Sequence, residues 1–194
     1  MRRDMRIGFI GLGNVGGKLA GSILRSDFDL TVRDLDSELE HSFARKGATI
    51  GESPAQIARN VDILITCLPN PAASANVMEG EDGALSAIGP GTIWAEMSTT
   101  DEREVRRLGE QVMAAGGEPI DCPVSGGCHR AATGNISIFA GTERSTFDKA
   151  LPVLTTLGRR VLHTGPLGSA SILKVLTNYL ASVNLAALAE ALMT

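Results

Sequence analysis

Hydrophobic residues at the start of the chain fall into short continuous runs separated by stretches with helical spacing. Residues 5–10 form the first run, whose length and apolar content are typical of a parallel strand buried on both faces. Apolar side chains then recur at helical spacing in residues 15–24, and further strand-like runs follow at residues 28–32 and 61–67. Strands that alternate with helices in this way predict a parallel, right-handed, doubly wound α/β sheet.

The same alternation continues through the rest of the chain. Further helices are predicted at residues 37–46, from residue 53 onwards, and at 72–78, 102–115 and 146–157, and further strands at 48–50, 92–96, 118–121, 135–140 and 160–163. The last helical pattern, residues 165–194, is apolar nearly all round, which is typical of a helix buried on most sides. No glycine or proline ends this pattern, so we expect a helix that is interrupted at the end of the chain.

Three glycines follow the first strand at the spacing G-x-G-x-x-G. Gly11 permits a tight turn, Gly13 leaves room for a pyrophosphate, and Gly16 lets the next helix pack closely on the strand. The phosphates are expected at the N terminus of that helix, where free N–H groups and the helix dipole favour negative charge. A tight packing turn is the alternative interpretation of the glycines alone, and the strands and helix around them favour the dinucleotide site.

An acidic residue stands where the second strand ends. Asp34 lies eighteen residues beyond Gly16, where a carboxylate can accept hydrogen bonds from both hydroxyls of a ribose. A carboxylate would repel the additional phosphate of NADP, so NAD is the favoured cofactor. Arg33 precedes Asp34, and the alternation of side chains along a strand predicts that the two point apart.

The composition is that of a soluble globular protein. Of the 194 residues 43% are hydrophobic and 21% are charged, and 18 basic residues against 22 acidic ones give a formal net charge of −4. Because the chain has no basic stripe, we expect no nucleic-acid partner. We also expect no membrane span, because lysine, asparagine and glutamate residues interrupt the most apolar segment, residues 172–194.

Three cysteines, Cys67, Cys122 and Cys128, occur without a C-x-x-C spacing. This arrangement predicts neither a disulfide framework nor a zinc site, and no other metal site is expected. Free thiols are typical of a reducing compartment, so we expect a cytoplasmic protein.

Two loops follow buried strands and are expected at the same edge of the sheet as the glycine turn. Leu68 and Pro69 follow one strand, and Ser98 and Thr99 follow the next. Open α/β sheets bind ligands at the carboxyl ends of their strands, which places Thr99 near the nicotinamide of a bound dinucleotide. Capping of the following helix is the alternative interpretation of Ser98 and Thr99.

Two further groups of residues carry candidate chemistry. Ser125, Gly126 and Gly127 offer a hydroxyl and consecutive backbone N–H groups, as an anion site does, although a flexible turn is the alternative interpretation. Lys174 and Asn178 lie four residues apart and therefore share one face of the last helix. Burial lowers the pKa of a lysine and makes its amine a proton donor and acceptor near neutral pH, whereas a lysine at the rim of an apolar surface is the alternative.

Five sequence segments occur in order along the chain: GLGNVGGKLA, CLPNP, EMSTTD, DCPVSGG and GPLGSASILKVLTN. With these segments the chain resembles the β-hydroxyacid dehydrogenases, a family that includes 3-hydroxyisobutyrate dehydrogenase and tartronate semialdehyde reductase (2-hydroxy-3-oxopropionate reductase), with 6-phosphogluconate dehydrogenase as a relative. The resemblance covers all 194 residues. It implies an NAD(P)-dependent oxidoreductase that transfers hydride between C4 of a nicotinamide and C3 of a small 3-hydroxy acid.

The resemblance implies a role for each candidate residue. Lys174 is implied as the general acid and base, with Asn178 as its companion. The implied pocket for the substrate carboxylate consists of Ser125, Gly126 and Gly127. The implied cofactor contacts, which include the glycine turn, are Gly11, Leu12, Gly13, Asn14, Val15, Gly16, Asp34, Leu68, Pro69 and Thr99.

The chain departs from the family pattern beside these residues. Ala170 replaces a usual glycine, and Tyr179 replaces the second residue of a common Asn-Asn pair. Cys128, His129 and Arg130 are bulkier and more charged than the small residues usual after the Ser-Gly-Gly sequence. These side chains would narrow the substrate pocket or add a cation for a second anionic group.

The resemblance also implies a division of the chain. Residues 1–164 correspond to the NAD-binding Rossmann-type domain, and residues 165–194 to the incomplete beginning of a C-terminal helical domain, so a truncated chain is expected. We expect the apolar helix to form a homo-oligomer through residues 172–194. A nucleotide-binding fragment without turnover is the alternative to an active enzyme, and imine reduction is a third hypothesis that Lys174 disfavours.

Overall fold

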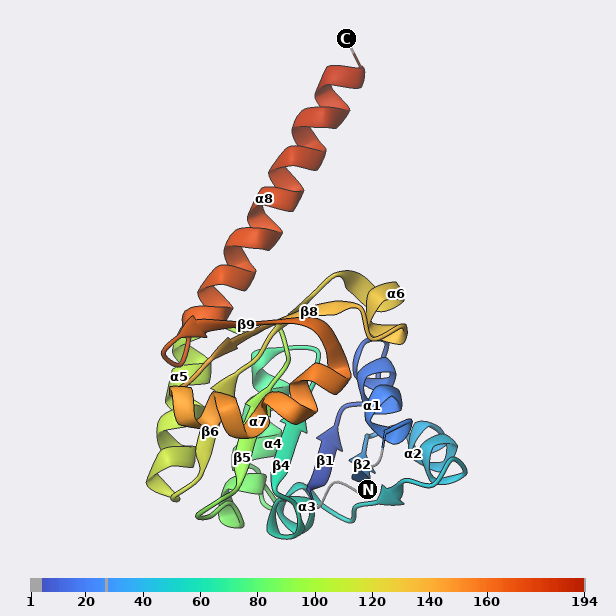
Figure 1. The fold of residues 1–194 in the computed structure, drawn as a ribbon, viewed down its shortest axis with the longest axis vertical. Coiled ribbons are helices and arrows are strands. Elements are labelled where there is room, and N and C mark those ends of the chain that lie inside the picture. The colour runs from blue at the N-terminus through green and yellow to red at the C-terminus, as the bar shows by residue number, and fades with distance from the viewer. Residues whose placement is uncertain (1–4, 27, 194) are drawn as a thin grey trace.

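The computed structural model describes residues 5–26 and 28–193. Within these ranges, nine strands form one sheet with helices on both of its faces (Figure 1). Six strands run parallel in the order β3-β2-β1-β4-β5-β6, and their bounds are β1 (Arg6–Ile10), β2 (Asp29–Arg33), β3 (Thr49–Ile50), β4 (Ile63–Thr66), β5 (Ile93–Glu96) and β6 (Glu118–Asp121). This arrangement confirms the predicted α/β, Rossmann-type doubly wound sheet.

The chain changes direction across the sheet beside β1. Strands β2 and β3 are added on one side of β1, whereas β4, β5 and β6 are added on the other. The connections that leave the carboxyl ends of these strands therefore diverge at β1, and this topological switch point is where open α/β sheets bind ligands.

Beyond β6 the sheet becomes mixed. Strand β8 (Ile136–Gly141) pairs antiparallel with β6 and with β7 (Val124–Ser125), and it pairs parallel with β9 (Gly158–Gly165). Strand β7 is absent from the predicted strands, because its two residues directly precede a Gly-Gly pair and become a strand only through pairing with β8.

Helices cover both faces of the sheet. Their bounds are α1 (Gly16–Leu24), α2 (Ser37–Ala44), α3 (Pro54–Asn60), α4 (Pro71–Glu79), α5 (Glu102–Ala114), α6 (Gly127–Ala132) and α7 (Arg144–Leu157), with a 3-10 turn η1 (Ala84–Ser86). Ser53 caps α3, since its Oγ accepts a hydrogen bond from the Gln56 N–H at 3.1 Å. The capping interpretation of Ser98 and Thr99 is wrong, because Asp101 caps α5 instead.

The hydrophobic core has two halves, one on each face of the sheet. Ile7 and Phe9 of β1 are fully buried in the half that α1 and α7 cover. Leu64 of β4 and Trp94 of β5 are fully buried in the half that α3 and α5 cover. Closely packed interiors resist deformation, so the strand ends at the switch point form a rigid frame.

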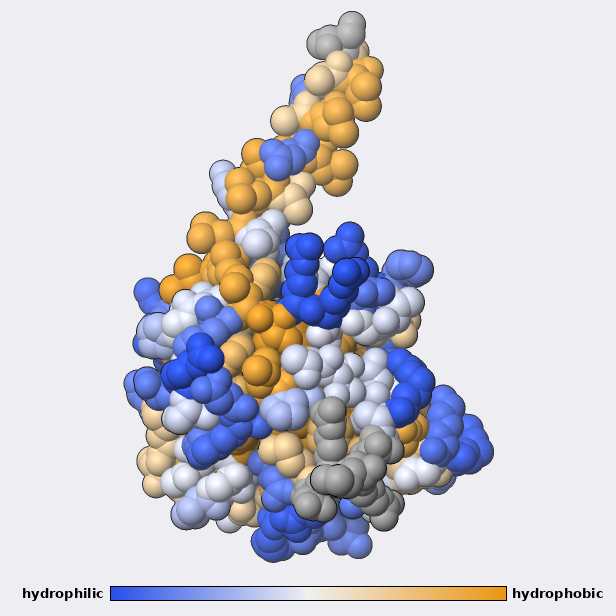
Figure 2. All heavy atoms as spheres, viewed as in Figure 1, coloured by the Kyte–Doolittle hydropathy of each residue, from blue (hydrophilic) through white to orange (hydrophobic). Residues whose placement is uncertain are grey.

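Helix α8 (Ser169–Leu192) leaves the domain and extends away from it (Figure 1). At a rise of 1.5 Å per residue its 24 residues are about 36 Å long. Within α8 only Ala170 and Ser171 are buried, and its apolar side chains form an exposed surface (Figure 2). The prediction of a helix buried on most sides is therefore wrong for the described residues, because only the beginning of α8 packs against the sheet. Thr194 of the predicted helix lies outside the described residues.

Helix α8 also has the length and composition of a membrane span, with a mean hydropathy of 1.4 over its most apolar window. A single helix of this kind is weak evidence for a membrane, because long apolar helices of soluble proteins have the same properties. Its polar residues include Lys174, Asn178 and Glu190.

Candidate functional site

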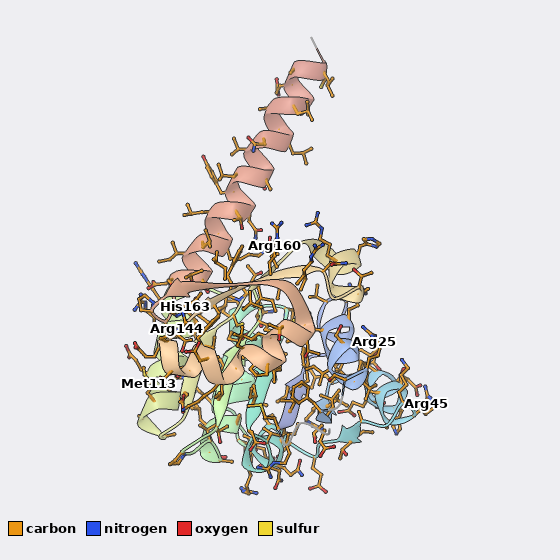
Figure 3. The ribbon with its side chains drawn as sticks, in the orientation of Figure 1. Arg25, Arg45, Met113, Arg144, Arg160 and His163 are labelled. Atoms are coloured by element: carbon orange, nitrogen blue, oxygen red, sulfur yellow. The ribbon has the colours of Figure 1, made fainter. Side chains whose placement is uncertain are left out.

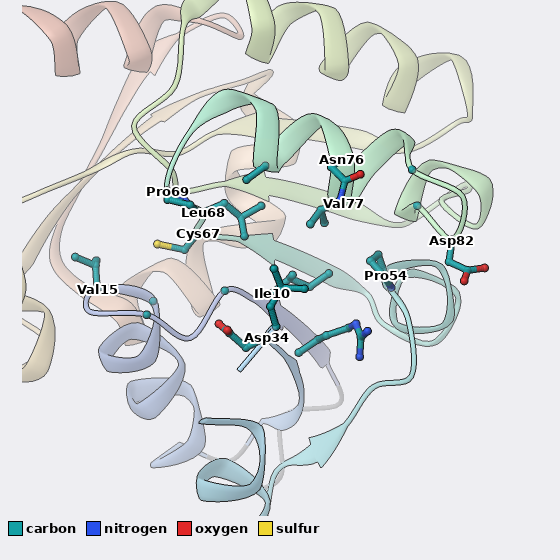
Figure 4. Close-up of a pocket in the computed structure, with 18 of the residues that line it drawn as sticks. Ile10, Val15, Asp34, Pro54, Cys67, Leu68, Pro69, Asn76, Val77 and Asp82 are labelled. Atoms are coloured by element: carbon teal, nitrogen blue, oxygen red, sulfur yellow. The ribbon is translucent and has the colours of Figure 1, made fainter. Parts of the chain in front are cut away.

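A cavity of about 660 Å³ opens at the topological switch point, beside the carboxyl ends of β1, β2 and β4 (Figure 4). The turn after β1 and the end of β2 form one wall, and the loop after β4 together with α4 forms the opposite wall. Of the predicted cofactor contacts, the structure brings together in this lining Gly11, Gly13, Asn14, Val15, Gly16, Asp34, Leu68 and Pro69. Other lining residues, which the sequence did not predict as cofactor contacts, include Pro54, Cys67, Ala73, Asn76 and Val77.

The three glycines of the turn are required for different reasons. Gly11 has a φ of 100°, and a Cβ there would overlap the carbonyl oxygen of Cys67. A Cβ at Gly16 would overlap the carbonyl oxygen of Gly11, so α1 packs too closely on the turn for any side chain. At Gly13, by contrast, no atom of the described residues lies within 4 Å of an added Cβ. The space beside Gly13 is therefore available to a ligand.

The N terminus of α1 faces the same turn. The helix begins at Gly16, and no side chain of the described residues caps it. Its first N–H groups and its dipole favour an anion, and a pyrophosphate beside Gly13 would lie at this position. The turn therefore fits the phosphates of a dinucleotide in both shape and charge.

The carboxylate of Asp34 is fixed at the end of β2 by two backbone groups. Its Oδ2 accepts a hydrogen bond from the Leu12 N–H at 2.5 Å, and its Oδ1 accepts one from the Asp36 N–H at 3.0 Å. Figure 4 shows Asp34 beside the glycine turn and below Ile10. Leu12 itself is buried and does not belong to the lining of this cavity, so its backbone orients Asp34 while contact of its side chain with a cofactor stays a prediction. Each carboxylate oxygen keeps a second lone pair with which it can accept a ribose hydroxyl.

Arg33 also lines this cavity, although neighbouring side chains of a strand leave the backbone on opposite sides. Its Nη1 donates to the carbonyl oxygen of Gly51 at 3.1 Å and lies 3.6 Å from Oε1 of Glu40. The same Glu40 oxygen accepts the N–H of Asp34 at 3.1 Å. The Arg33 guanidinium is therefore engaged by the protein itself, which opposes its use for an additional cofactor phosphate.

A buried polar chain positions the loop that carries Leu68. The Leu68 N–H donates to Oγ of Ser98 at 2.7 Å, and the Ser98 N–H donates to Oε1 of Glu96 at 2.8 Å. Burial raises the pKa of the Glu96 carboxyl group, which is almost completely inaccessible. Ser98 is thus a positioning residue behind the cavity, and a carboxylate inside the otherwise apolar run IWAE was the sequence signal for this network.

Cys67 lines the cavity, whereas Thr99 does not. Burial raises the pKa of the Cys67 thiol to about 12, so this lining residue stays protonated and unreactive. Thr99 is exposed and does not belong to the cavity lining. Its predicted place beside the nicotinamide stays a prediction.

The predicted substrate loop lies outside the cavity, where β7 meets α6. Ser125 ends β7 and is half-buried, whereas Gly126 and Gly127 are exposed with φ angles of 132° and 75°. Residues other than glycine rarely adopt such positive φ values, so the backbone of this loop requires both glycines.

The predicted catalytic pair lies on α8. Lys174 is half-buried, and burial lowers the pKa of its amine. Asn178 is exposed one turn further along the helix. Neither residue lines the cavity, so contact between this pair and a cofactor stays a prediction.

Asp121 anchors the beginning of α8 to the sheet. One carboxylate oxygen accepts the Ser171 N–H at 2.7 Å, and the other accepts the Ser171 hydroxyl, also at 2.7 Å. Asp121 ends β6 and is fully buried, and burial raises the pKa of its carboxyl group. Because residues three apart share a helix face, Lys174 lies on the same side of α8 as Ser171.

Residues 6–165 match the family model described as the NAD binding domain of 6-phosphogluconate dehydrogenase. The chain belongs to the β-hydroxyacid dehydrogenase family. It is 33% identical over 192 residues to 2-(hydroxymethyl)glutarate dehydrogenase of Eubacterium barkeri, with 99% of the chain and 64% of the relative covered. It is 32% identical over 186 residues to the mitochondrial 3-hydroxyisobutyrate dehydrogenase of Rattus norvegicus, with 96% and 56% covered.

Solved structures of the family have the same fold. The 3-hydroxyisobutyrate dehydrogenase of Mycobacterium tuberculosis, solved with L-serine, superposes with a TM-score of 0.91 at 27% identity, over 96% of this chain and 63% of that one. The chain therefore spans 56% to 64% of the length of the relatives named here. Membership of the family confirms the resemblance and the expected cofactor, NAD.

Proposed function

We propose that the protein is an NAD-dependent oxidoreductase that transfers hydride between a nicotinamide and a small 3-hydroxy acid. The observation that supports this function best is a single cavity that combines open space beside Gly13 with the anchored carboxylate of Asp34. These two features match what a pyrophosphate and a ribose require. When bound, NAD supplies the nicotinamide C4 that accepts or returns the hydride.

In this proposal the proton moves through Lys174. Burial lowers the pKa of the Lys174 amine, which increases the fraction of neutral amine near neutral pH. Its Nζ takes the proton of the substrate hydroxyl as hydride leaves C3, and it returns that proton in the reverse direction. Asn178 would hold a substrate oxygen, and the loop of residues 125–127 would bind the substrate carboxylate.

The names of the two relatives support one class of substrate for this proposal. Both 3-hydroxyisobutyrate and 2-(hydroxymethyl)glutarate are 3-hydroxypropionates with a substituent at C2. This substituent is a methyl group in the first acid and carries a second carboxylate in the other. We therefore propose a 2-substituted 3-hydroxypropionate as the substrate.

We also propose the division of the chain and its self-association. Residues 1–164 form the NAD-binding domain, and residues 165–194 begin a helical domain. Homo-oligomerisation through α8 would cover apolar side chains that the described domain leaves exposed, such as Leu180 and Leu185.

The test of the proposed function begins with calorimetric titration of the protein with NAD+. The protein is then mixed with NAD+ and each of the two acids, and absorbance of the reduced cofactor is followed. We expect binding of NAD+ and reduction with at least one acid. Binding without reduction on any 3-hydroxy acid would support the alternative, a nucleotide-binding protein without turnover.

A variant of Lys174 tests the proposed proton transfer. Lys174→Ala should abolish reduction of the cofactor and leave the affinity for NAD+ within about twofold, because Lys174 lies outside the cavity lining. A variant that retains full turnover would refute the role of Lys174.

A further inference from the structure

Arg160 and the predicted substrate loop lie on one face of the sheet formed by β7, β8 and β9. Ser125 of β7 pairs with Ser137 of β8, and Ser137 pairs with Arg160 of β9. Residues paired in register project from the same face of a sheet, so all three side chains share one face. Figure 3 shows Arg160 on the side of β9 from which α8 rises, between α8 and α6.

Arg130 borders the same loop from α6. A Cβ placed on Gly126 would lie 2.9 Å from Cδ and 3.4 Å from Cβ of Arg130. The alkyl stem of Arg130 therefore packs directly on Gly126, and its exposed guanidinium extends from there. The loop of residues 125–127 thus has one arginine beside it on α6 and a second one on β9.

Neither guanidinium group has an acidic partner in the part of the chain that the structure describes. Within residues 5–26 and 28–193, no carboxylate lies within ion-pair distance of Arg130 or Arg160, whereas Arg107 pairs with two glutamates. Figure 2 shows strongly hydrophilic side chains at the base of α8, beside α6. No described carboxylate offsets the charge of either guanidinium group, so an anion that both can contact would be bound favourably.

The spacing suits a short molecule with two charged ends. Neighbouring strands lie about 4.8 Å apart, so two strand spacings put the Cα atoms of Ser125 and Arg160 about 10 Å apart. The side chain of Arg160, when extended, is long enough to span much of the distance to Ser125. A ligand with one carboxylate at Ser125 would then present a second anionic group to Arg130 and Arg160.

We propose that the substrate is a dianionic 3-hydroxy acid, whose second anionic group is bound by Arg130 and Arg160. This proposal rests on the proposed function, because it takes the loop of residues 125–127 as the site of the first carboxylate. Arginine is suited to this task, since its planar fork binds carboxylates through two parallel hydrogen bonds. The two arginines would therefore favour a substrate whose C2 substituent carries a negative charge, compared with one whose substituent is a methyl group.

The experiment compares two acids on the same protein. Nitrogen-15 NMR titrations with 2-(hydroxymethyl)glutarate and with 3-hydroxyisobutyrate, in the presence of saturating NAD+ and at low ionic strength, measure both dissociation constants. We expect the dianion to bind at least tenfold more tightly. Arg130→Gln and Arg160→Gln should each weaken dianion binding by about tenfold and change monoanion binding by less than about twofold.

A matched control removes one positive charge elsewhere. Arg45 is an exposed arginine that directly follows α2, far from Arg160 in Figure 3, and Arg45→Gln should leave both affinities unchanged. Equal affinities of the two acids for the unaltered protein would overturn the proposal, as would equal losses for both acids in the variants. Weaker NAD+ binding in Arg130→Gln would assign this arginine to a cofactor phosphate and would also overturn it.

The outcomes separate this proposal from the proposed function. If NAD+ binds and neither acid does, the dianion site is refuted while the nucleotide site stands. If NAD+ does not bind, the proposed function itself fails. Dianion binding that is lost in both variants supports the site whether or not the acid is oxidised.

Discussion

Alanine at Gly16 should destabilise the fold, whereas alanine at Gly13 should weaken cofactor binding without destabilising it. An added Cβ at Gly16 meets the carbonyl oxygen of Gly11, a backbone atom that moves only if the turn moves. Overpacking of this kind costs roughly 1–3 kcal/mol of unfolding free energy. For a domain of this size, 1 kcal/mol corresponds to roughly 2–4 °C in Tm, so Gly16→Ala should lower Tm by about 2–12 °C.

Gly13→Ala meets no atom of the described residues within 4 Å, and Gly13 is not among the glycines with positive φ. Alanine reduces the conformational entropy of the unfolded chain, so Tm should stay unchanged or rise by roughly 1–4 °C. The new methyl group fills the space that the phosphates need, and the affinity for NAD+ should fall at least tenfold.

Thermal unfolding by circular dichroism and titration calorimetry with NAD+ measure the two effects on the same samples. If Gly13→Ala binds NAD+ as tightly as the unaltered protein, the phosphates do not lie beside this turn. If Gly16→Ala unfolds at the original temperature, the assigned packing of α1 on the turn is incorrect. Loss of both stability and binding in both variants would show that the turn has a purely structural role.

Three further predictions concern the carboxylates and the exposed helix. In Asp34→Asn, the dissociation constant for NADP+ divided by that for NAD+ should fall at least tenfold, because the negative charge that would face the ribose disappears. Calorimetry measures both constants, and an unchanged ratio would show that Asp34 does not contact the ribose. Glu96 has a folded-state pKa above its unfolded value, so between these values the folded chain binds more protons and unfolding free energy falls as pH rises. Glu96→Gln removes this pH-dependent loss of unfolding free energy and offers the buried Ser74 hydroxyl a hydrogen-bond donor. The Tm of the variant should therefore exceed that of the unaltered protein at pH 8, and the difference should shrink towards pH 4.5. A lower Tm of the variant at pH 8 would show that the charged carboxylate is needed. Sedimentation equilibrium should show self-association that Leu180→Glu abolishes and that Met113→Glu, an equally exposed change on α5, does not; a monomer at every concentration would refute association through α8.

Local chemistry explains which features the sequence could predict. The glycine turn and Asp34 are recognisable because φ angles, helix capping and strand ends depend on neighbouring residues, and the structure brings these residues into one cavity. The central strands are recognisable for a similar reason, since Ile63 to Thr66 are all buried and form a continuous apolar run.

Features that depend on distant contacts were not predictable in the same way. Ser98 precedes a helix, as capping residues do, yet its hydroxyl accepts a hydrogen bond from Leu68, thirty residues earlier in the chain. Strand β7 exists only through its pairing with β8. The exposure of α8 could not be inferred from its apolar pattern. Such a pattern indicates which side chains are suited to burial, but it does not indicate which surface would cover them.

The anchor at Asp121 links the cavity at the switch point to the predicted catalytic lysine. Asp121 ends β6 at the same sheet edge at which β1, β2 and β4 open into the cavity, and its two hydrogen bonds fix Ser171 to that edge. Lys174 follows one turn later and is half-buried, so the rigid sheet determines its position relative to the cavity. From Asn178 onwards every described residue of α8 is exposed. The sheet therefore sets the place of the Lys174 amine, whereas the exposed remainder of the helix has no such anchor within the described residues.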